Sequence, residues 1–308
     1  MKTLMRILGA TMAVCITAMV AIFTLLIIRH SIFDTSKSPM SPHVAVLDLY
    51  GVIYSSSTFI KETEHLEQTK QCKAVVIRIN SPGGVVAPSQ EIYEAIRSLD
   101  KKIPVIISMG SLSASGGYYA ALGGRKIFAN PGTLTASIGV IMELMNTERL
   151  LEWAKVERFA IKSGKLKDIG SPTRKMLPEE KAFLQSLLND VHNQFRATVK
   201  ERRKLTDEEL EQTADGRVMT GSQAKQAKLV DVLGGYQDAV KEAKKMAGLP
   251  DSAPVIVKEP SQGLLKNLLL GDPEEESRWD HLFNSIKNGL STLFSSAQWR
   301  ILYLSPIQ

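Results

Sequence analysis

Short apolar runs alternate with helical segments from residue 44 onward, and this alternation limits the fold more than any other feature of the chain. The runs with strand composition are 44–49, 74–79, 104–108, 126–129, 138–142 and 158–162. Helical spacing occurs over residues 57–71, 89–99, 115–122, 147–155 and 178–203. Because strands joined through helices pair in parallel, the sequence predicts an α/β protein with a mainly parallel sheet.

An uncharged run of twenty-two residues, 7–28, lies between Arg6 and Arg29. As a helix it would be ~33 Å long, enough to cross a hydrocarbon core of ~30 Å. A cleaved signal peptide is the alternative, but its apolar region is shorter and ends in a small-x-small site, which the end of this run lacks. We therefore expect a transmembrane anchor over residues 1–30.

The remaining chain divides by composition into a linker (31–42), a folded body (43–250) and an amphipathic tail (251–308). Lys2, Arg6 and the α-amine before the apolar run favour a cytoplasmic N-terminus. The expected location is a single-pass membrane protein with its body on the extracytoplasmic side, the periplasmic face of an inner membrane. The tail is a candidate oligomer or membrane contact, or it closes the core.

Overall composition excludes several classes of protein. The 308 residues are 44% hydrophobic and 23% charged, as in ordinary globular domains. Two cysteines are too few for a disulfide framework or a structural zinc site. The net charge is +6, but aromatic residues make up only 6% and no basic stretch is interleaved with them, so we expect no nucleic-acid partner.

Ser115 follows the apolar run 104–108 and precedes two glycines, at an expected strand-to-helix turn. A serine at such a turn is well placed for nucleophilic attack, as in the G-x-S-x-G elbow, although Ser113 stands where that motif has its first glycine. The alternative is a helix-capping serine followed by glycines that allow tight packing. The residues alone leave both readings open.

The turn 81–84, SPGG, follows the run 74–79. Its glycines, Gly83 and Gly84, can aim backbone N–H groups at a developing oxyanion. The alternative is a turn that needs glycine for a positive φ.

A serine nucleophile needs a base, and none of the five histidines stands in a setting that suggests a triad. A lysine can serve if burial or nearby cations keep it neutral. Residues 160–172 follow an expected strand and offer Lys162, Lys165 and Lys167. Period-2 alternation places Lys165 and Lys167 on one face and Lys162 on the other. A solvated basic loop is the alternative.

Four motifs occur in the order SPGG (81–84), SASGGYY (113–119), TASIGV (135–140) and KSGKLKDIGSP (162–172). Together with the apolar N-terminus, they resemble the signal peptide peptidase A (SppA-type) family over residues 44–247. The resemblance implies a Clp-protease/crotonase-like fold, a ββα superhelix preceded by one transmembrane helix. It also implies a serine endopeptidase with a Ser/Lys dyad.

The resemblance also implies a role for individual residues. Ser115 would be the nucleophile and Lys167 the general base, whereas Lys165 falls at a position that the family motif leaves open. Ser137 would hydrogen-bond the lysine amine and orient it. Gly83 would supply an oxyanion N–H, with Gly84 or Gly116 as partner.

The implied substrates are apolar peptides, namely signal-peptide remnants, and no metal or cofactor is needed. Family members of this length form homo-oligomeric rings in which the serine and the lysine can come from neighbouring subunits. Two alternatives have the same fold: a crotonase-like acyl-CoA enzyme, and an inactive peptidase-fold membrane scaffold.

Overall fold

A computed structural model describes residues 41–257 and, by its backbone, the short strand 302–304. The expected transmembrane run and most of the tail lie outside these residues. Within the described part of the chain, no helix is both long and apolar enough to span a bilayer. The described residues all belong to the unit that begins at Pro42, apart from Ser41.

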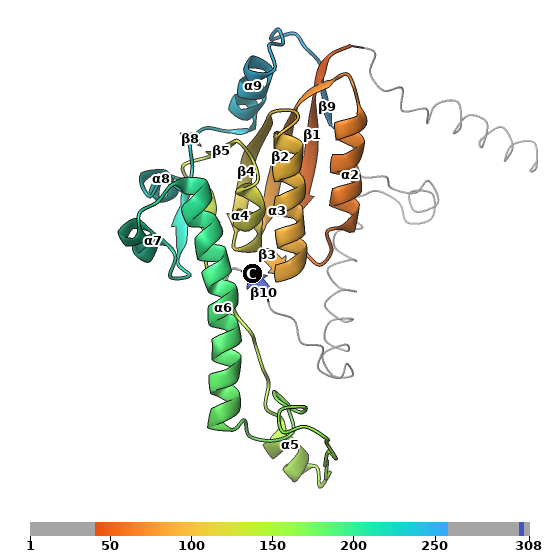
Figure 1. The fold of residues 1–308 in the computed structure, drawn as a ribbon, viewed down its shortest axis with the longest axis vertical. Helices are drawn as coiled ribbons and strands as arrows, with labels where there is room; N and C mark the ends of the chain where they lie inside the picture. Colours follow the sequence, from red (N-terminus) through yellow and green to blue (C-terminus); the bar gives the residue numbers. More distant parts are fainter. Residues whose placement is uncertain (1–40, 258–301, 305–308) are drawn as a thin grey trace, which may run out of the picture. The chain divides into compact units, whose positions relative to one another are not determined.

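The body is built on one mixed sheet of eight strands (Figure 1). Its central path is β7-β6-β4-β2-β1-β9, with β5 beside β4 and β8 beside β5. The pairs are parallel except for β6 with β7, which is antiparallel. The strands are β1 (His43–Tyr50), β2 (Cys72–Ser81), β4 (Val105–Ala114), β5 (Lys126–Ala129), β6 (Leu134–Ala136), β7 (Val218–Thr220), β8 (Val232–Leu233) and β9 (Val255–Val257). The mainly parallel α/β architecture predicted from the alternation is confirmed.

Two short strands stand apart from this sheet. β3 (Gly83–Val85) and β10 (Leu302–Leu304) form an antiparallel pair in which Leu302 lies opposite Val85 and Leu304 opposite Gly83. A segment near the end of the sequence therefore lies beside the predicted oxyanion turn.

The described helices connect and cover the strands. They are α2 (Ser57–Gln68), α3 (Val86–Asp100), α4 (Gly116–Ala121), α5 (Glu148–Trp153), α6 (Pro178–Arg203), α7 (Asp207–Thr213), α8 (Gly221–Gln226) and α9 (Tyr236–Met246). Side chains alternate between the two faces of a strand, and the two apolar clusters follow this alternation. One face packs against α2, α3 and α4, and the other packs against α9.

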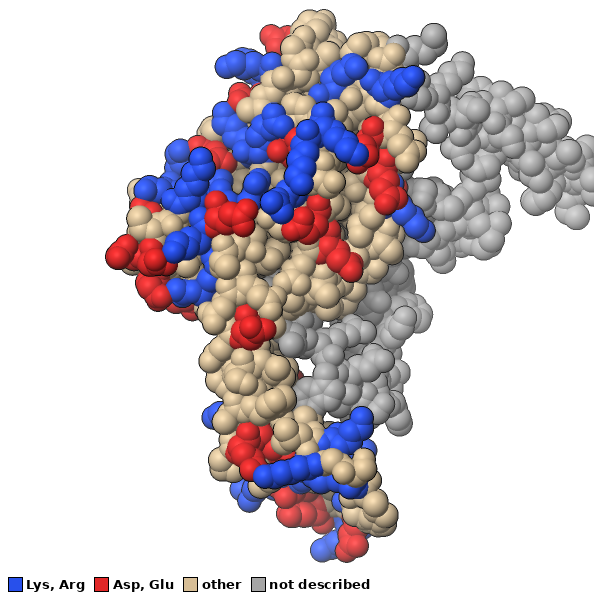
Figure 2. All heavy atoms as spheres, viewed as in Figure 1, with Lys and Arg blue, Asp and Glu red and all other residues tan. Residues whose placement is uncertain are grey.

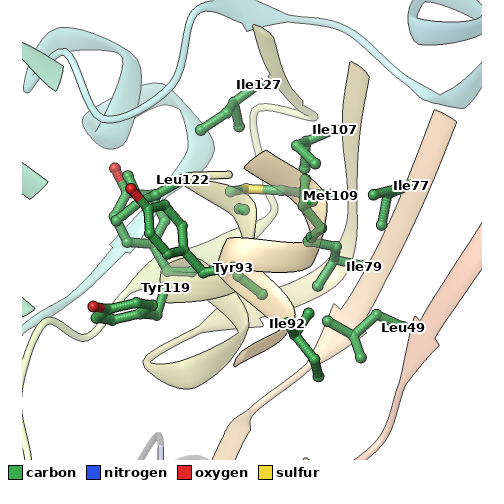
Figure 3. Close-up of a cluster of buried hydrophobic side chains, with 14 of the residues drawn as sticks. Leu49, Ile77, Ile79, Ile92, Tyr93, Ile107, Met109, Tyr119, Leu122 and Ile127 are labelled. Atoms are coloured by element: carbon green, nitrogen blue, oxygen red, sulfur yellow. The ribbon is translucent and has the colours of Figure 1, made fainter. Parts of the chain in front are cut away.

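The larger cluster is centred on the face of β2 and β4 that packs against α3 and α4 (Figure 3). Ile77, Ile79, Ile107 and Met109 are fully buried there. The rings of Tyr93, Tyr119 and Phe195 close one side: the Tyr93 and Tyr119 centroids are 5.4 Å apart, and those of Tyr119 and Phe195 are 4.8 Å apart. This contact joins α3, α4 and the second half of α6.

Two predicted strands are wrong. Residues 138–142 form no strand; β6 ends at Ala136, because Ala136 and Ser137 have φ values of 62° and 52° that interrupt the extended backbone. Residues 158–162 also form no strand. Phe159 and Ile161 are both exposed, so this segment has no buried face to dock on a sheet.

The first half of α6 extends beyond the sheet, and α5 lies near its N-terminal end (Figure 1). We call residues 147–187 the arm. No residue of α5 is buried, and Trp153 is 80% exposed. At 1.5 Å per residue, the 26 residues of α6 span about 39 Å, so this helix reaches from the core to the end of the arm.

The two halves of α6 should differ sharply in their contribution to stability. Phe195→Ala removes a fully buried ring and is expected to lower the free energy of unfolding by about 3–5 kcal/mol. Phe183→Ala, on the exposed half, is the matched control and should cost less than about 1 kcal/mol. Urea denaturation followed by circular dichroism measures both. Equal losses would mean that the first half of α6 is also packed in solution.

Candidate active site

Ser115 lies where β4 ends and α4 begins. Its backbone has φ 55° and ψ −118°, a conformation that costs a non-glycine residue about 1–3 kcal/mol. The side chain is fully buried and makes no cap hydrogen bond. Among the described residues, its Oγ has no hydrogen-bond partner. The helix-capping reading is therefore not supported, and the geometry is that of a nucleophile elbow.

Contacts on both sides hold this strained turn in place. The Ser115 N–H donates to the carbonyl of Ala136 at 2.8 Å. In α4, the Tyr118 hydroxyl donates to the carbonyl of Leu229 at 2.9 Å, and the Tyr119 hydroxyl lies 3.0 Å from that of Thr198. The hydroxyl of Ser115 is thus presented by rigid elements.

The predicted oxyanion turn lies next to this elbow. Ser81 is paired with Ser113 in the sheet register, and a Cβ at Gly117 would come within 2.8 Å of the Ser81 carbonyl oxygen. The N–H of Gly83 donates to Ser81 Oγ at 3.1 Å. Gly83 has φ 102°, so the positive-φ requirement weighed in the sequence holds for this glycine. Ser81 therefore connects the SPGG turn to the start of α4.

β3 runs alongside the segment that contains Ile53. The Ile53 N–H donates to Gly83 O, and the Val85 N–H donates to Ile53 O, both at 2.8 Å. A Cβ at Gly84 would lie 2.1 Å from Ile53 O, so only glycine fits there. Because β10 pairs with β3 in an antiparallel register, β3 offers an edge to an extended segment.

Ser137 directly follows Ala136, whose carbonyl accepts the Ser115 N–H. It is buried and lines a cavity of about 330 Å³. His192 on α6 borders the same cavity, with its Nε2 3.0 Å from Ile138 O. The structure thus brings Ser137 close to Ser115 through the neighbouring residue Ala136.

The three candidate lysines lie in a series of turns, so the strand-based assignment of their faces loses its basis. Lys162 forms an ion pair with Asp168, and Lys165 binds Glu179 at 2.7 Å. Lys167 is exposed and has no ion pair with any residue that the structure describes. Of the three, Lys167 is therefore the one whose amine is not engaged with a carboxylate.

Within one chain, Lys167 lies exposed on the arm, whereas Ser115 is buried in the body. Asp168, the next residue, is tied through Arg174 to Glu180 at the start of α6. Phe195, which packs against Tyr119, lies fifteen positions further along the same helix, or about 22 Å. The structure thus brings Ser115, Ser137 and the glycines together, and it does not bring Lys167 to them in the same chain.

The sequence reading missed a charged network in the arm. The guanidinium of Arg174 lies between Asp168 and Glu180, and Glu180 is only 1% exposed. Hydrogen bonds from Arg174 are the main reason that the pKa of Asp168 falls well below its usual range and that of Glu180 falls to about 2. The available signal was the even spacing of opposite charges at 168, 174 and 180. No group of three metal-ligating side chains occurs in residues 41–257.

Comparison with known proteins identifies the class. The sequence profile of peptidase family S49 matches residues 97–250, and that of Clp protease matches residues 49–135. The chain therefore belongs to peptidase family S49 and is a peptidase of the SppA type, with a Clp-protease-like α/β fold.

Individual relatives agree with this assignment. A Synechocystis protein named "Putative protease slr0021" is 42% identical over 249 residues, which cover 80% of this chain and 90% of that protein. The "Putative signal peptide peptidase SppA" of Enterococcus faecium is 34% identical over 70% of this chain and 63% of its own length. "Protease 4" of Salmonella typhi is 38% identical over 58% of this chain and 29% of its own length.

Gly84 offers a test of the β3 edge. Gly84→Ala forces β3 away from Ile53, so we expect the catalytic efficiency of peptide hydrolysis to fall by about 100-fold. Gly132→Ala is the control, because an added Cβ meets nothing within 4 Å there and activity should be unchanged. Full activity in Gly84→Ala would show that β3 does not need this close approach.

Proposed function

We propose that this protein is a membrane-anchored serine endopeptidase in which Ser115 and Lys167 form a dyad that cleaves apolar peptides, in particular signal-peptide remnants. One observation carries the proposal. The Ser115 hydroxyl is fully buried and without a partner, on a strained turn beside an edge that accepts an extended strand. Membership of peptidase family S49 supports it.

The proposed reaction is acyl transfer. The neutral amine of Lys167 takes the proton of the Ser115 hydroxyl as Oγ attacks the peptide carbonyl carbon. Backbone N–H groups of Gly84 or Gly116, or that of Gly83 once released from Ser81 Oγ, stabilise the oxyanion that forms. The lysine then gives its proton to the leaving amine, and an acyl-enzyme remains. Water, deprotonated by the same amine, releases the acid and restores Ser115.

The backbone of β10 supports the proposed way in which a peptide binds. An extended segment lies antiparallel on Gly83–Val85, within the turn that is expected to bind the oxyanion. A substrate strand in that place would be held by main-chain hydrogen bonds, which are independent of side-chain identity. This suits an enzyme that acts on apolar peptides of varied sequence.

We further propose that the dyad is completed between subunits of a homo-oligomeric ring. About 22 Å of α6 separate Glu180, which is tied to the lysine segment, from Phe195, which packs against Tyr119 of α4. Apolar side chains on the arm are exposed in the single chain and would be covered by a neighbour. They include Leu150, Trp153, Phe159 and Ile161.

Each member of the dyad should be essential. Ser115→Ala and Lys167→Ala are expected to lose hydrolysis of an apolar leader-like peptide. Lys167→Arg should also be inactive, because a guanidinium stays protonated. An active-site serine probe should label the wild-type protein at Ser115 and should fail on Lys167→Ala. A folded, assembled wild-type protein that is never labelled would instead favour an inactive scaffold.

Coexpression of the two inactive variants tests whether subunits share the site. In a ring with equal numbers of Ser115→Ala and Lys167→Ala chains, about a quarter of the sites would pair an intact serine with an intact lysine. We therefore expect about a quarter of wild-type activity. A dyad within one chain predicts no recovery, which would contradict the shared site.

The proposed anchor, residues 7–28, would hold the body at the extracytoplasmic face of the membrane. The full-length protein should stay in the membrane pellet after an alkaline carbonate wash. Ala18→Arg, a charge in the middle of the run, should release much of it, because an arginine at the bilayer centre costs about 2.5–3.5 kcal/mol. Release of the wild-type protein by carbonate would argue against a spanning helix.

A further inference from the structure

The segment that carries Lys167 is fastened to α6 by one arginine. Arg174 makes a bidentate contact with Glu180, Nη2 to Oε1 at 2.6 Å and Nη1 to Oε2 at 2.8 Å. Its Nε donates to Asp168 Oδ2 at 2.9 Å, and its Nη2 donates to the Asp168 carbonyl at 3.1 Å. One planar guanidinium therefore holds both the side chain and the backbone of the residue after Lys167.

Glu180 on α6 is itself held in a fixed environment, which stabilises its contact with Arg174. Glu180 is almost fully buried, and its carboxylate also accepts the N–H of Leu177 at 2.9 Å. A buried carboxylate is costly unless it is paired, so Glu180 without Arg174 would be strongly destabilised. A second contact ties the segment after Lys167 to the residue before α5, because the Thr147 N–H donates to Pro172 O at 2.6 Å. The network is therefore a fixed part of the arm.

The charges in this network have a direct consequence for a lysine base. Asp168 receives two cations, Lys162 on Oδ1 and Arg174 on Oδ2. A carboxylate without these partners, one residue from Lys167, would favour the protonated amine. With both cations in place the charge of Asp168 is compensated, so its attraction for a neighbouring ammonium is reduced. Figure 2 shows acidic and basic side chains side by side at the end of the arm.

We propose that Arg174 and Glu180 are positioning residues for the base: they fix the Lys167 segment to α6 and, with Lys162, neutralise Asp168 so that its charge does not hold the lysine protonated. This inference rests on the dyad proposed above. It gives functions to residues that contact neither the serine nor the substrate.

Other charged groups near this segment belong to three stretches of chain. Besides Lys162, Asp168, Arg174 and Glu180, they are Lys165 in the turns, Lys175 after Arg174, Glu179 at the start of α6, and Glu148 on α5. Glu179 is paired with Lys165 and Glu180 with Arg174. Asp168 is the carboxylate adjacent in sequence to Lys167, so its neutralisation is the step to test.

The test measures kcat/KM for a fluorogenic apolar peptide across pH in the full-length protein. Arg174→Gln leaves Asp168 with one cation, so its negative charge favours the protonated lysine more strongly. The acid limb of the profile of kcat/KM against pH should therefore move to higher pH by about one unit. Asp168→Asn removes the negative charge, so the limb should move to lower pH. Arg174→Lys keeps the positive charge but cannot make the bidentate contact with Glu180. The acid limb of its pH profile should stay in place, while kcat falls about tenfold.

Arg196→Gln is the matched control. Arg196 lies on α6 outside the arm, is similarly buried to Arg174 and forms an ion pair with Glu211. Its profile should equal that of the wild-type protein. Circular dichroism and sedimentation show whether each variant is folded and assembled to the same extent.

The outcomes separate this inference from the dyad itself. An acid limb that does not move in folded, assembled Arg174→Gln overturns the inference and leaves the dyad intact. An equal shift in Arg196→Gln, or shifts in the same direction for Arg174→Gln and Asp168→Asn, also overturns it. Retained activity in Lys167→Ala would refute the dyad, and the inference with it.

Discussion

The site depends on one strained residue held by the end of a strand. Ser115 adopts a positive φ that its side chain disfavours, and its hydroxyl is buried without a partner. Both costs are offset by the contacts around it: the hydrogen bond to Ala136, the tyrosine anchors of α4 and the packing of Gly117 on Ser81. A residue kept in this state by its surroundings is typical of a catalytic nucleophile rather than of a helix cap.

The length of α6 determines where the lysine segment lies relative to the core. One end of this helix is in the core through Phe195, and the other holds the lysine segment through Glu180. A rigid helix between the two groups gives the arm a defined reach, because α-helices have a fixed rise per residue. In the proposed dyad, the contact of Arg174 with Glu180 at the start of α6 would set the position of Lys167. The helix α6 therefore both contributes to the core and fixes the position of the lysine segment.

Much of the body follows from local pattern. The strand 126–129 and the helix 178–203 have the predicted bounds, and Pro178 is the first residue of α6 as expected for a helix start. The errors have physical causes. Residues 138–142 look like a strand by composition, but the positive φ values at Ala136 and Ser137 end β6 early. Residues 158–162 alternate as a strand does, yet they have no partner strand and no buried face.

By itself, the sequence determined the class of fold, the turn that bears Ser115 and the residue types needed for a Ser/Lys mechanism, because apolar spacing and glycine placement act over a few neighbouring residues. Only the tertiary structure decided which lysine is free of a carboxylate among the described residues, where Ser137 and the SPGG turn meet Ser115, and that Lys167 lies on the arm. These facts depend on contacts between residues distant in sequence. Ion pairs, sheet register and the direction of a long helix exist only once the chain is folded.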